Sequence, residues 1–196
     1  MNIKSYIPNA FTMANLFCGM LGVFFAATGH LDYAAYAVVA GVFFDFFDGF
    51  FARMFKVEGE LGLQLDSLAD VVTSGVAPAV VMVQLLSEAF TGSYIEMESL
   101  LGDNTWNHSW AEWLPFIGLL IAVASAYRLA KFNVDTRQTS GFIGLPTPAN
   151  ALLILSLPLI LQFQYSELAE TIILNRWFLI GMTLLSCILL NAEIPL

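Results

Sequence analysis

Four aspartates lie close together in the chain, inside otherwise apolar segments. Asp45 and Asp48 are three residues apart in FFDFFDGFFARMF, and Asp66 and Asp70 are four residues apart in LGLQLDSLAD. Residues three or four apart share one face of a helix. If these segments form two antiparallel helices joined by a short link, the two pairs of carboxylates converge on one site.

Four carboxylates in an apolar setting repel one another and cost a few kcal/mol or more unless a cation compensates for them. Arg53 is a local cationic side chain, but one guanidinium cannot neutralise four acids. A set of aspartate oxygens with no nearby His or Cys favours hard divalent cations, Mg²⁺ or Mn²⁺ first and Ca²⁺ as a further candidate. Two such ions a few ångströms apart would hold a pyrophosphate, so the predicted chemistry is phosphoryl transfer.

Acidic residues in membrane helices also occur as structural pairs or as the coupling site of an ion-coupled transporter. A transporter would not explain the small and basic residues beside the aspartates. Gly49 would let the backbone approach a ligand, Ala52 would keep the wall thin, and Arg53 could form a fork with phosphate oxygens. Gly62 would let the next helix begin close to its neighbour.

The elements that must position these residues are membrane helices. The 196 residues are 58% hydrophobic and 12% charged, whereas soluble domains have roughly 25% charged residues. Apolar runs predict six spans, at about 10–28, 33–54, 64–90, 113–134, 146–164 and 172–191. Lipid offers no partners for free backbone groups, so all six are expected to be helices. The sequence therefore predicts an all-α integral membrane protein with one catalytic domain over residues 1–196.

Charged residues are divided unevenly between the two predicted sides of the membrane. One side receives Lys4, Arg53, Lys56, Arg128, Lys131 and Arg137, and the other receives Glu88, Glu96, Glu98, Asp103, Glu112, Glu167, Glu170 and a single basic residue, Arg176. The positive-inside rule then places both termini and the aspartates on the cytoplasmic side of the cell membrane. The net charge of −9 gives no reason to expect a nucleic-acid partner.

Residues 45–70 contain the string D-x2-D-G-x2-A-R-x8-G-x3-D-x3-D. It resembles the signature of the CDP-alcohol phosphotransferase family. The resemblance implies a six-helix enzyme, usually a homodimer, that acts on CDP-diacylglycerol among membrane lipids. By the family pattern Asp45, Asp48 and Asp66 would bind the metals, Asp70 would be a further ligand and the general base, and Gly49 and Arg53 would hold the CDP group.

Four flanking segments narrow the prediction: IPNAFTMANLFCG, LDSLADVVTSGVAPA, YRLAKFN and GFIGLPTPAN. They resemble the phosphatidylserine synthases within this family, which implies L-serine as the acceptor alcohol. Glycerol 3-phosphate or an inositol phosphate is the alternative acceptor with the same chemistry. Those acceptors carry a phosphate, so they would need a denser cluster of basic residues than this chain offers.

Residues near the first span complete the expected CDP-diacylglycerol site. Asn9 and Thr12 could face the nucleotide, or Asn9 could cap the helix while Thr12 bonds back to its own helix. Gly59 stands where relatives often have Ser or Thr near the phosphates. The residues predicted to bind the donor are Asn9, Thr12, Asp48, Gly49, Ala52, Arg53, Gly59 and Gly62.

Two basic residues at the end of the fourth span are candidates for binding an anion. Arg128 and Lys131 are three residues apart and share a predicted helix face. They could bind the carboxylate of serine or a lipid phosphate, or their charged ends could extend to the membrane surface. Lys131 stands where relatives often have Arg, and a lysine cannot form the bidentate fork of a guanidinium.

Overall fold

The computed structural model describes residues 6–57, 59–95, 110–134 and 144–193, and every regular element in these ranges is a helix. The elements are α1 (Tyr6–Ala27), α2 (Leu31–Phe55), α3 (Glu60–Asp70), the π-helical segment η2 (Val71–Val76), α4 (Ala77–Thr91), α6 (Trp110–Trp113), the 3₁₀ segment η3 (Leu114–Leu119), α7 (Leu120–Val134), α8 (Thr147–Phe163), α9 (Glu167–Ile173) and α10 (Arg176–Asn191). The prediction of an all-helical chain is confirmed for these residues.

Several helices are long and apolar enough to cross a membrane. Four continuous helical stretches meet that standard: Tyr6–Ala27, Leu31–Phe55, Glu60–Thr91 and Trp110–Val134. The pair α9 and α10, bent by 57°, would make a fifth span if it crosses as one unit. The helix α8 is also apolar but is shorter, with 17 residues. The chain is a multi-pass membrane protein by these helices, and the count of six spans stays a prediction.

The first span begins earlier than predicted, at Tyr6 rather than near residue 10. Its buried residues recur every three or four positions and are small or polar: Pro8, Thr12, Asn15, Gly19, Gly22 and Ala26. This stripe lets α1 pack closely against α2, α3 and α4. At Gly19 an added Cβ would lie 2.8 Å from the Cα of Thr73, and at Gly41 it would lie 2.7 Å from the Cγ2 of Thr73. The two glycines therefore allow α1, α2 and η2 to meet.

The third span is a continuous helical stretch with a change of register at η2. Pro78 has no N–H to donate to the carbonyl of Ser74, four residues earlier, so the α-helical hydrogen-bond ladder cannot continue unchanged through this turn. The π-helical segment directly follows Asp70. The helix α4 then runs through the centre of the bundle, with ten of its fifteen residues buried.

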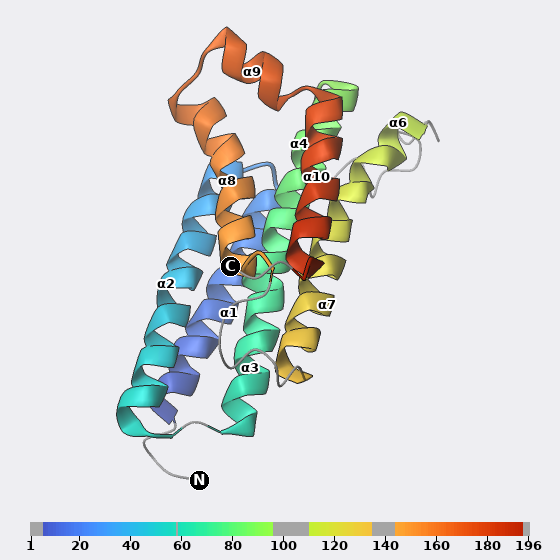
Figure 1. Cartoon of the computed structure of the whole chain (residues 1–196). Coiled ribbons are helices and arrows are strands. Elements are labelled where there is room, and N and C mark those ends of the chain that lie inside the picture. Colours follow the sequence, from blue (N-terminus) through green and yellow to red (C-terminus); the bar gives the residue numbers. More distant parts are fainter. Residues whose placement is uncertain (1–5, 58, 96–109, 135–143, 194–196) are drawn as a thin grey trace, which may run out of the picture.

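The bundle has two distinct ends (Figure 1). The C-terminal end of α2 and the start of α3 lie at the lower end, whereas the start of α2, the end of α4 and the transverse helix α9 lie at the upper end. Large aromatic side chains such as Phe17, Phe24, Phe43 and Phe46 are exposed on the outside of the helices. An apolar exterior of this kind suits contact with lipid chains.

Candidate metal centre and substrate cavity

Three carboxylates from two helices meet at one point in the lower half of the bundle. Asp45 and Asp48 lie on the last turns of α2, and Asp66 lies on the second turn of α3. One oxygen from each lies within 4.8 Å of the others. The helix α1 packs against both α2 and α3 and so holds them in place. The structure thus brings together three of the four carboxylates that were predicted to converge.

The reversal between α2 and α3 has a local cause. Lys56 adopts a left-handed conformation, with φ 53° and ψ 46°, and its N–H group and that of Val57 return to the last carbonyls of α2. Gly59 is extended and precedes the first residue of α3. This tight connection turns the chain back, so the aspartates of α2 and α3 face one another.

Asp48 is held by a residue of α1. The hydroxyl of Thr12 donates a hydrogen bond of 2.6 Å to Asp48 Oδ2, and the carboxylate is only 6% exposed. The same hydroxyl lies 3.2 Å from the carbonyl of Pro8, which is the back-bond considered above. Because a hydroxyl has one proton, the shorter contact to the charged acceptor is the stronger one. Thr12 therefore orients an aspartate of the group.

Asp70 lies one helical turn beyond Asp66 and outside the group of three. Its carboxyl lies beside that of Asp45, and its Oδ1 accepts a hydrogen bond of 3.3 Å from Asn15 Nδ2. The guanidinium of Arg128 on α7 is close enough for its charge to act on Asp70. Asp70 thus has a distinct environment, with an amide donor on one side and a cation on another.

The group of three fits a divalent metal ion. Its donors are all carboxylate oxygens, the ligands that hard cations such as Mg²⁺ prefer. Asp66 Oδ1 is buried and has no hydrogen-bond partner among the described residues, so an oxygen remains available for coordination. Three acids this close together need a cation for charge compensation. Asp45, Asp48 and Asp66 could therefore hold a metal ion.

A cavity of about 760 Å³ opens beside these carboxylates. Asp48 and Asp66 form part of its wall, and Phe132 on α7 closes another part. The eight residues predicted to bind the donor all line it: Asn9, Thr12, Asp48, Gly49, Ala52, Arg53, Gly59 and Gly62. The structure therefore brings the eight together around one space, and their role in binding stays a prediction.

Some reasons for these predictions need correction. Gly62 is not required for close helix packing, because an added Cβ would lie at an ordinary contact distance of 3.7 Å from Asn9 Oδ1. Asn9 is not an N-cap, since it lies inside the first turn of α1. The guanidinium of Arg53 donates a hydrogen bond of 3.0 Å from Nε to the carbonyl of Gly49, and Arg53 is an exposed residue in the lining of the cavity. Its terminal nitrogens remain available to a ligand.

Arg128 and Lys131, predicted to bind an anion, lie in different surroundings, and their role in binding stays a prediction. Arg128 is buried and close enough to Asp70 for their charges to interact, whereas Lys131 forms an ion pair of 2.9 Å with Glu193. Three residues on a helix place two side chains on one face, but their long stems can diverge. Lys4 and Arg137, also used for the predicted orientation, lie outside the described residues, as do Glu96, Glu98 and Asp103.

Sequence reasoning missed Asn15. Its side chain is fully buried, its amide donates to Asp70, and its backbone carbonyl accepts a hydrogen bond of 3.1 Å from Thr73. The available signal was its position, because Asn15 lies three residues after Thr12 on the same helix face and is a polar residue in an apolar span. A buried amide at that position is costly unless it has a partner.

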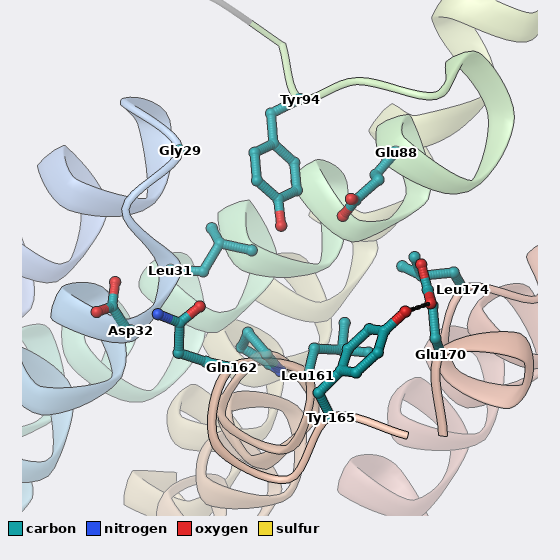
Figure 2. Close-up of a pocket in the computed structure, with 11 residues that line it drawn as sticks. Gly29, Leu31, Asp32, Glu88, Tyr94, Leu161, Gln162, Tyr165, Glu170 and Leu174 are labelled. Atoms are coloured by element: carbon teal, nitrogen blue, oxygen red, sulfur yellow. Dashed lines mark hydrogen bonds between the residues drawn. The ribbon is translucent and has the colours of Figure 1, made fainter. Parts of the chain in front are cut away.

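A second cavity, of about 270 Å³, lies at the opposite end of the bundle and is shown in Figure 2. It is lined by residues from the α1–α2 turn, the end of α4, the end of α8 and α9, including Glu88, Tyr94, Tyr165 and Glu170. The hydroxyl of Tyr165 donates a hydrogen bond of 2.8 Å to Glu170 (Figure 2). The predicted catalytic residues are all absent from its lining, so it is separate from the metal centre.

The long apolar helices and the three-carboxylate group together define a class: a multi-pass membrane protein with an acidic site that can hold a metal ion. Within that class the chain belongs to the CDP-alcohol phosphatidyltransferase family, whose model matches residues 5–189. It is therefore a transferase of a substituted phosphate group, with a CDP-alcohol donor and an alcohol acceptor implied by the family.

Named relatives are similar along most of the chain. The CDP-diacylglycerol–serine O-phosphatidyltransferase of Bacillus subtilis (strain 168) is 32% identical over 84% of this chain and 79% of its own length. The protein of the same name from Helicobacter pylori (strain ATCC 700392 / 26695) is 32% identical over 91% and 69%. The archaetidylserine synthase of Methanothermobacter thermautotrophicus is 32% identical over 88% and 66%.

Proposed function

We propose that this chain transfers the phosphatidyl group of CDP-diacylglycerol to the hydroxyl of L-serine, with release of CMP. The observation that carries the proposal is the cavity whose wall includes Asp48 and Asp66 of the carboxylate group. A nucleotide lipid bound in this cavity would therefore lie next to the carboxylates that are proposed to promote phosphoryl transfer. The family supports the reaction class, and the names of the relatives support serine as the acceptor.

The donor would lie in the cavity with its pyrophosphate against the carboxylate end. Gly49 and Ala52 present a thin wall there, since an added Cβ at Gly49 has no neighbour closer than 3.8 Å. Arg53 would exchange its bond to the Gly49 carbonyl for phosphate oxygens, which a guanidinium binds in a bidentate manner. Two Mg²⁺ or Mn²⁺ ions held by Asp45, Asp48 and Asp66, with Asp70 as a further ligand, would neutralise the pyrophosphate charge.

Asp70 is the proposed general base. Its carboxylate would take the proton from the serine hydroxyl as the serine oxygen forms a bond to the phosphorus that carries diacylglycerol. The bond from that phosphorus to the oxygen of CMP breaks, and CMP leaves with both electrons of that bond. Asn15 donates to Oδ1 of Asp70 and so helps to orient its carboxyl.

Serine fits the charges around Asp70 better than a phosphorylated acceptor does. Arg128 is the basic side chain that acts on Asp70, and the ammonium of Lys131 is directed instead to Glu193. One guanidinium matches the single carboxylate of serine, whereas a phosphate dianion would call for more positive charge. Glycerol 3-phosphate and inositol phosphate are therefore the weaker candidates for the acceptor.

The proposal also includes the setting of the enzyme. We place it in the cell membrane as one domain of six spans, because the 17 residues of α8 reach the lower limit of about 17 residues for a transmembrane helix. Arg53, Lys56 and Lys131 lie at the metal end, and Glu88, Glu167 and Glu170 lie at the other end. The positive-inside rule puts the metal end and both termini in the cytoplasm. The functional unit is proposed to be a homodimer.

Two measurements test the proposed function. Purified enzyme with CDP-diacylglycerol and a panel of labelled acceptors should form labelled lipid from L-serine, and faster transfer to glycerol 3-phosphate or inositol phosphate would overturn the choice of acceptor. Asp70→Asn should abolish transfer while the protein stays folded and still binds CDP-diacylglycerol. Full activity of that variant would remove Asp70 as the base.

A further inference from the structure

Buried polar groups without hydrogen-bond partners occur on four helical elements that pack together in the bundle. Five residues from four elements contribute such groups among the described residues: Ser74 of η2, Ser125 and Arg128 of α7, Asn150 of α8 and Ser186 of α10. We call them the polar cluster. Ser74, Ser125 and Asn150 are fully buried, and both the Oδ1 and the Nδ2 of Asn150 lack a hydrogen-bond partner within the described structure.

Partnerless groups of this kind are unusual, because buried polar atoms in proteins nearly always have a hydrogen-bond partner. Some other buried polar residues of this chain follow that rule, although single oxygens of Asn15, Asp66, Glu88 and Asn191 also lack a partner among the described residues. Gln84 donates to the carbonyls of Ala26 and Ile95 and accepts from the N–H of Ile95, and Thr183 donates 2.8 Å to the carbonyl of Leu179. The polar cluster therefore has free hydrogen-bonding capacity that a ligand could use.

The members of the cluster come from elements that pack together. The segment η2 packs against α7 and α8, and α10 packs against the same two helices. An added Cβ at Gly75 would lie 3.1 Å from the Cβ of Ser125. The N–H of Leu145 donates 3.0 Å to the carbonyl of Leu189, which sets the start of α8 level with the end of α10. Because these helices run antiparallel, Asn150 and Ser186 lie at a similar height.

The cluster lies close to the reacting groups, because Ser74 is four residues after Asp70 on the same helical stretch. The guanidinium of Arg128 is also close enough for its charge to act on Asp70. An acceptor molecule bound here would therefore have its hydroxyl near the proposed base. The cluster combines one guanidinium, one amide with both a donor and an acceptor, and three hydroxyls. This set matches a small zwitterion, which carries one carboxylate to pair with the guanidinium and one ammonium to donate to neutral oxygens.

We propose that the polar cluster is the acceptor pocket, and that Asn150 is a specificity-determining residue that binds the ammonium and carboxylate groups of the acceptor amino acid. The inference rests on the proposed function, since it assigns a place to the serine that function requires. Arg128 supplies the only positive charge of the cluster, so acceptors with a phosphate dianion are discriminated against. An amino alcohol without the carboxylate would leave Arg128 unpaired and bind poorly.

The test uses Asn150→Leu in the full-length enzyme. Leucine has a similar volume and brings no polar atoms, so the variant should melt at or above the temperature of the parent protein. We expect the KM for L-serine to rise by about tenfold or more, as expected for a lost hydrogen bond to a charged group. The KM for CDP-diacylglycerol should stay unchanged. Ser125→Ala, a smaller change, should raise the serine KM by a few-fold in the same direction.

Thr183→Val is the matched control. It removes a buried hydroxyl from α10, one turn before Ser186, but that hydroxyl bonds its own helix. The control should leave the serine KM unchanged. An unchanged serine KM in both Asn150→Leu and Ser125→Ala, or an equal rise of the KM for both substrates, would overturn the inference.

The outcome separates the two proposals. If the parent enzyme does not use L-serine, the proposed function fails and the acceptor panel shows it before any variant is made. If the parent enzyme uses L-serine but the variants keep the parental serine KM, the proposed function stands and the acceptor pocket lies elsewhere.

Discussion

Both ends of this bundle have a cavity lined by acidic residues, but the carboxylates at the two ends have different neighbours. At the lower end Asp45, Asp48 and Asp66 place oxygens within 4.8 Å of one another, and a buried oxygen of Asp66 has no hydrogen-bond partner in the described part of the chain. At the upper end Glu170 accepts a hydrogen bond from Tyr165, and Glu88 lies beside Tyr94 (Figure 2).

Each of these two upper acids lies beside a tyrosine, and one oxygen of Glu88 is buried without a hydrogen-bond partner in the described part of the chain. The hydrogen bond to Glu170 raises the pKa of Tyr165, and burial followed by the charge of Glu88 raises the pKa of Tyr94. A raised pKa means that the phenol keeps its proton, so these contacts are present below the usual tyrosine value of about 10 and are lost only as the pH rises beyond it. The lower acids differ because three of them lie next to one another. Carboxylates that lie this close together indicate a cation site, whereas separate carboxylates beside a phenol indicate a structural role.

Asp66→Asn, at the lower end, should have the largest effect on activity. The substitution removes a charged ligand of the metal, and the loss of roughly 4 kcal/mol of transition-state stabilisation would lower CMP release by about 1,000-fold. The thermal midpoint of the metal-free protein should stay equal or rise, because the variant relieves repulsion among the three acids. Near-normal CMP release by the folded variant would show that Asp66 is not a ligand.

Removal of divalent metal is expected to have the next largest effect. Chelation should reduce CMP release by about 100-fold or more, and Mg²⁺ or Mn²⁺ should restore it. The ion should also raise the thermal midpoint of the parent protein, since a ligand at 100 times its Kd stabilises the folded state by about 2.7 kcal/mol. In Asp66→Asn that rise should shrink. Undiminished turnover in EDTA would refute the metal centre.

Thr12→Val should have an intermediate effect. Valine keeps the shape of threonine but cannot donate the 2.6 Å hydrogen bond to Asp48. Loss of a partner that orients a metal ligand lowers metal affinity or activity by about 10- to 100-fold. A titration of activity against Mg²⁺ would detect the weaker binding as a higher half-saturating concentration. An unchanged metal requirement would mean that the hydroxyl bonds only to Pro8.

Gln84→Leu, near the upper end, should change activity least. The substitution leaves the carbonyls of Ala26 and Ile95 and the N–H of Ile95 without their side-chain partner, which should lower the free energy of unfolding by about 1–3 kcal/mol. Activity per folded molecule, measured by CMP release, should stay within about twofold of the parent value. A large loss of activity at full folding would show that the two ends are coupled.

Much of the metal centre could be predicted from the spacing of residues within single helices. Asp45 and Asp48 share a face because of helix periodicity, and the short link to Asp66 brings the second helix back alongside. The eight residues around the cavity were also found together, since they follow one another along α1, α2 and α3. Local periodicity and short connections leave few other arrangements.

What depended on contacts between distant segments was not visible in the sequence. Asn15 donates a hydrogen bond to Asp70, 55 positions away in the sequence, and Gly19 and Gly41 lie against Thr73. Lys131 forms an ion pair with Glu193, although it shares a predicted helix face with Arg128. The polar cluster joins four elements that only the packing of the bundle brings together. The sequence by itself determined which residues could do the chemistry and which helix face carries them. The tertiary structure decided which polar groups find partners and which are left for a ligand, because hydrogen bonding between helices depends on their relative positions in space.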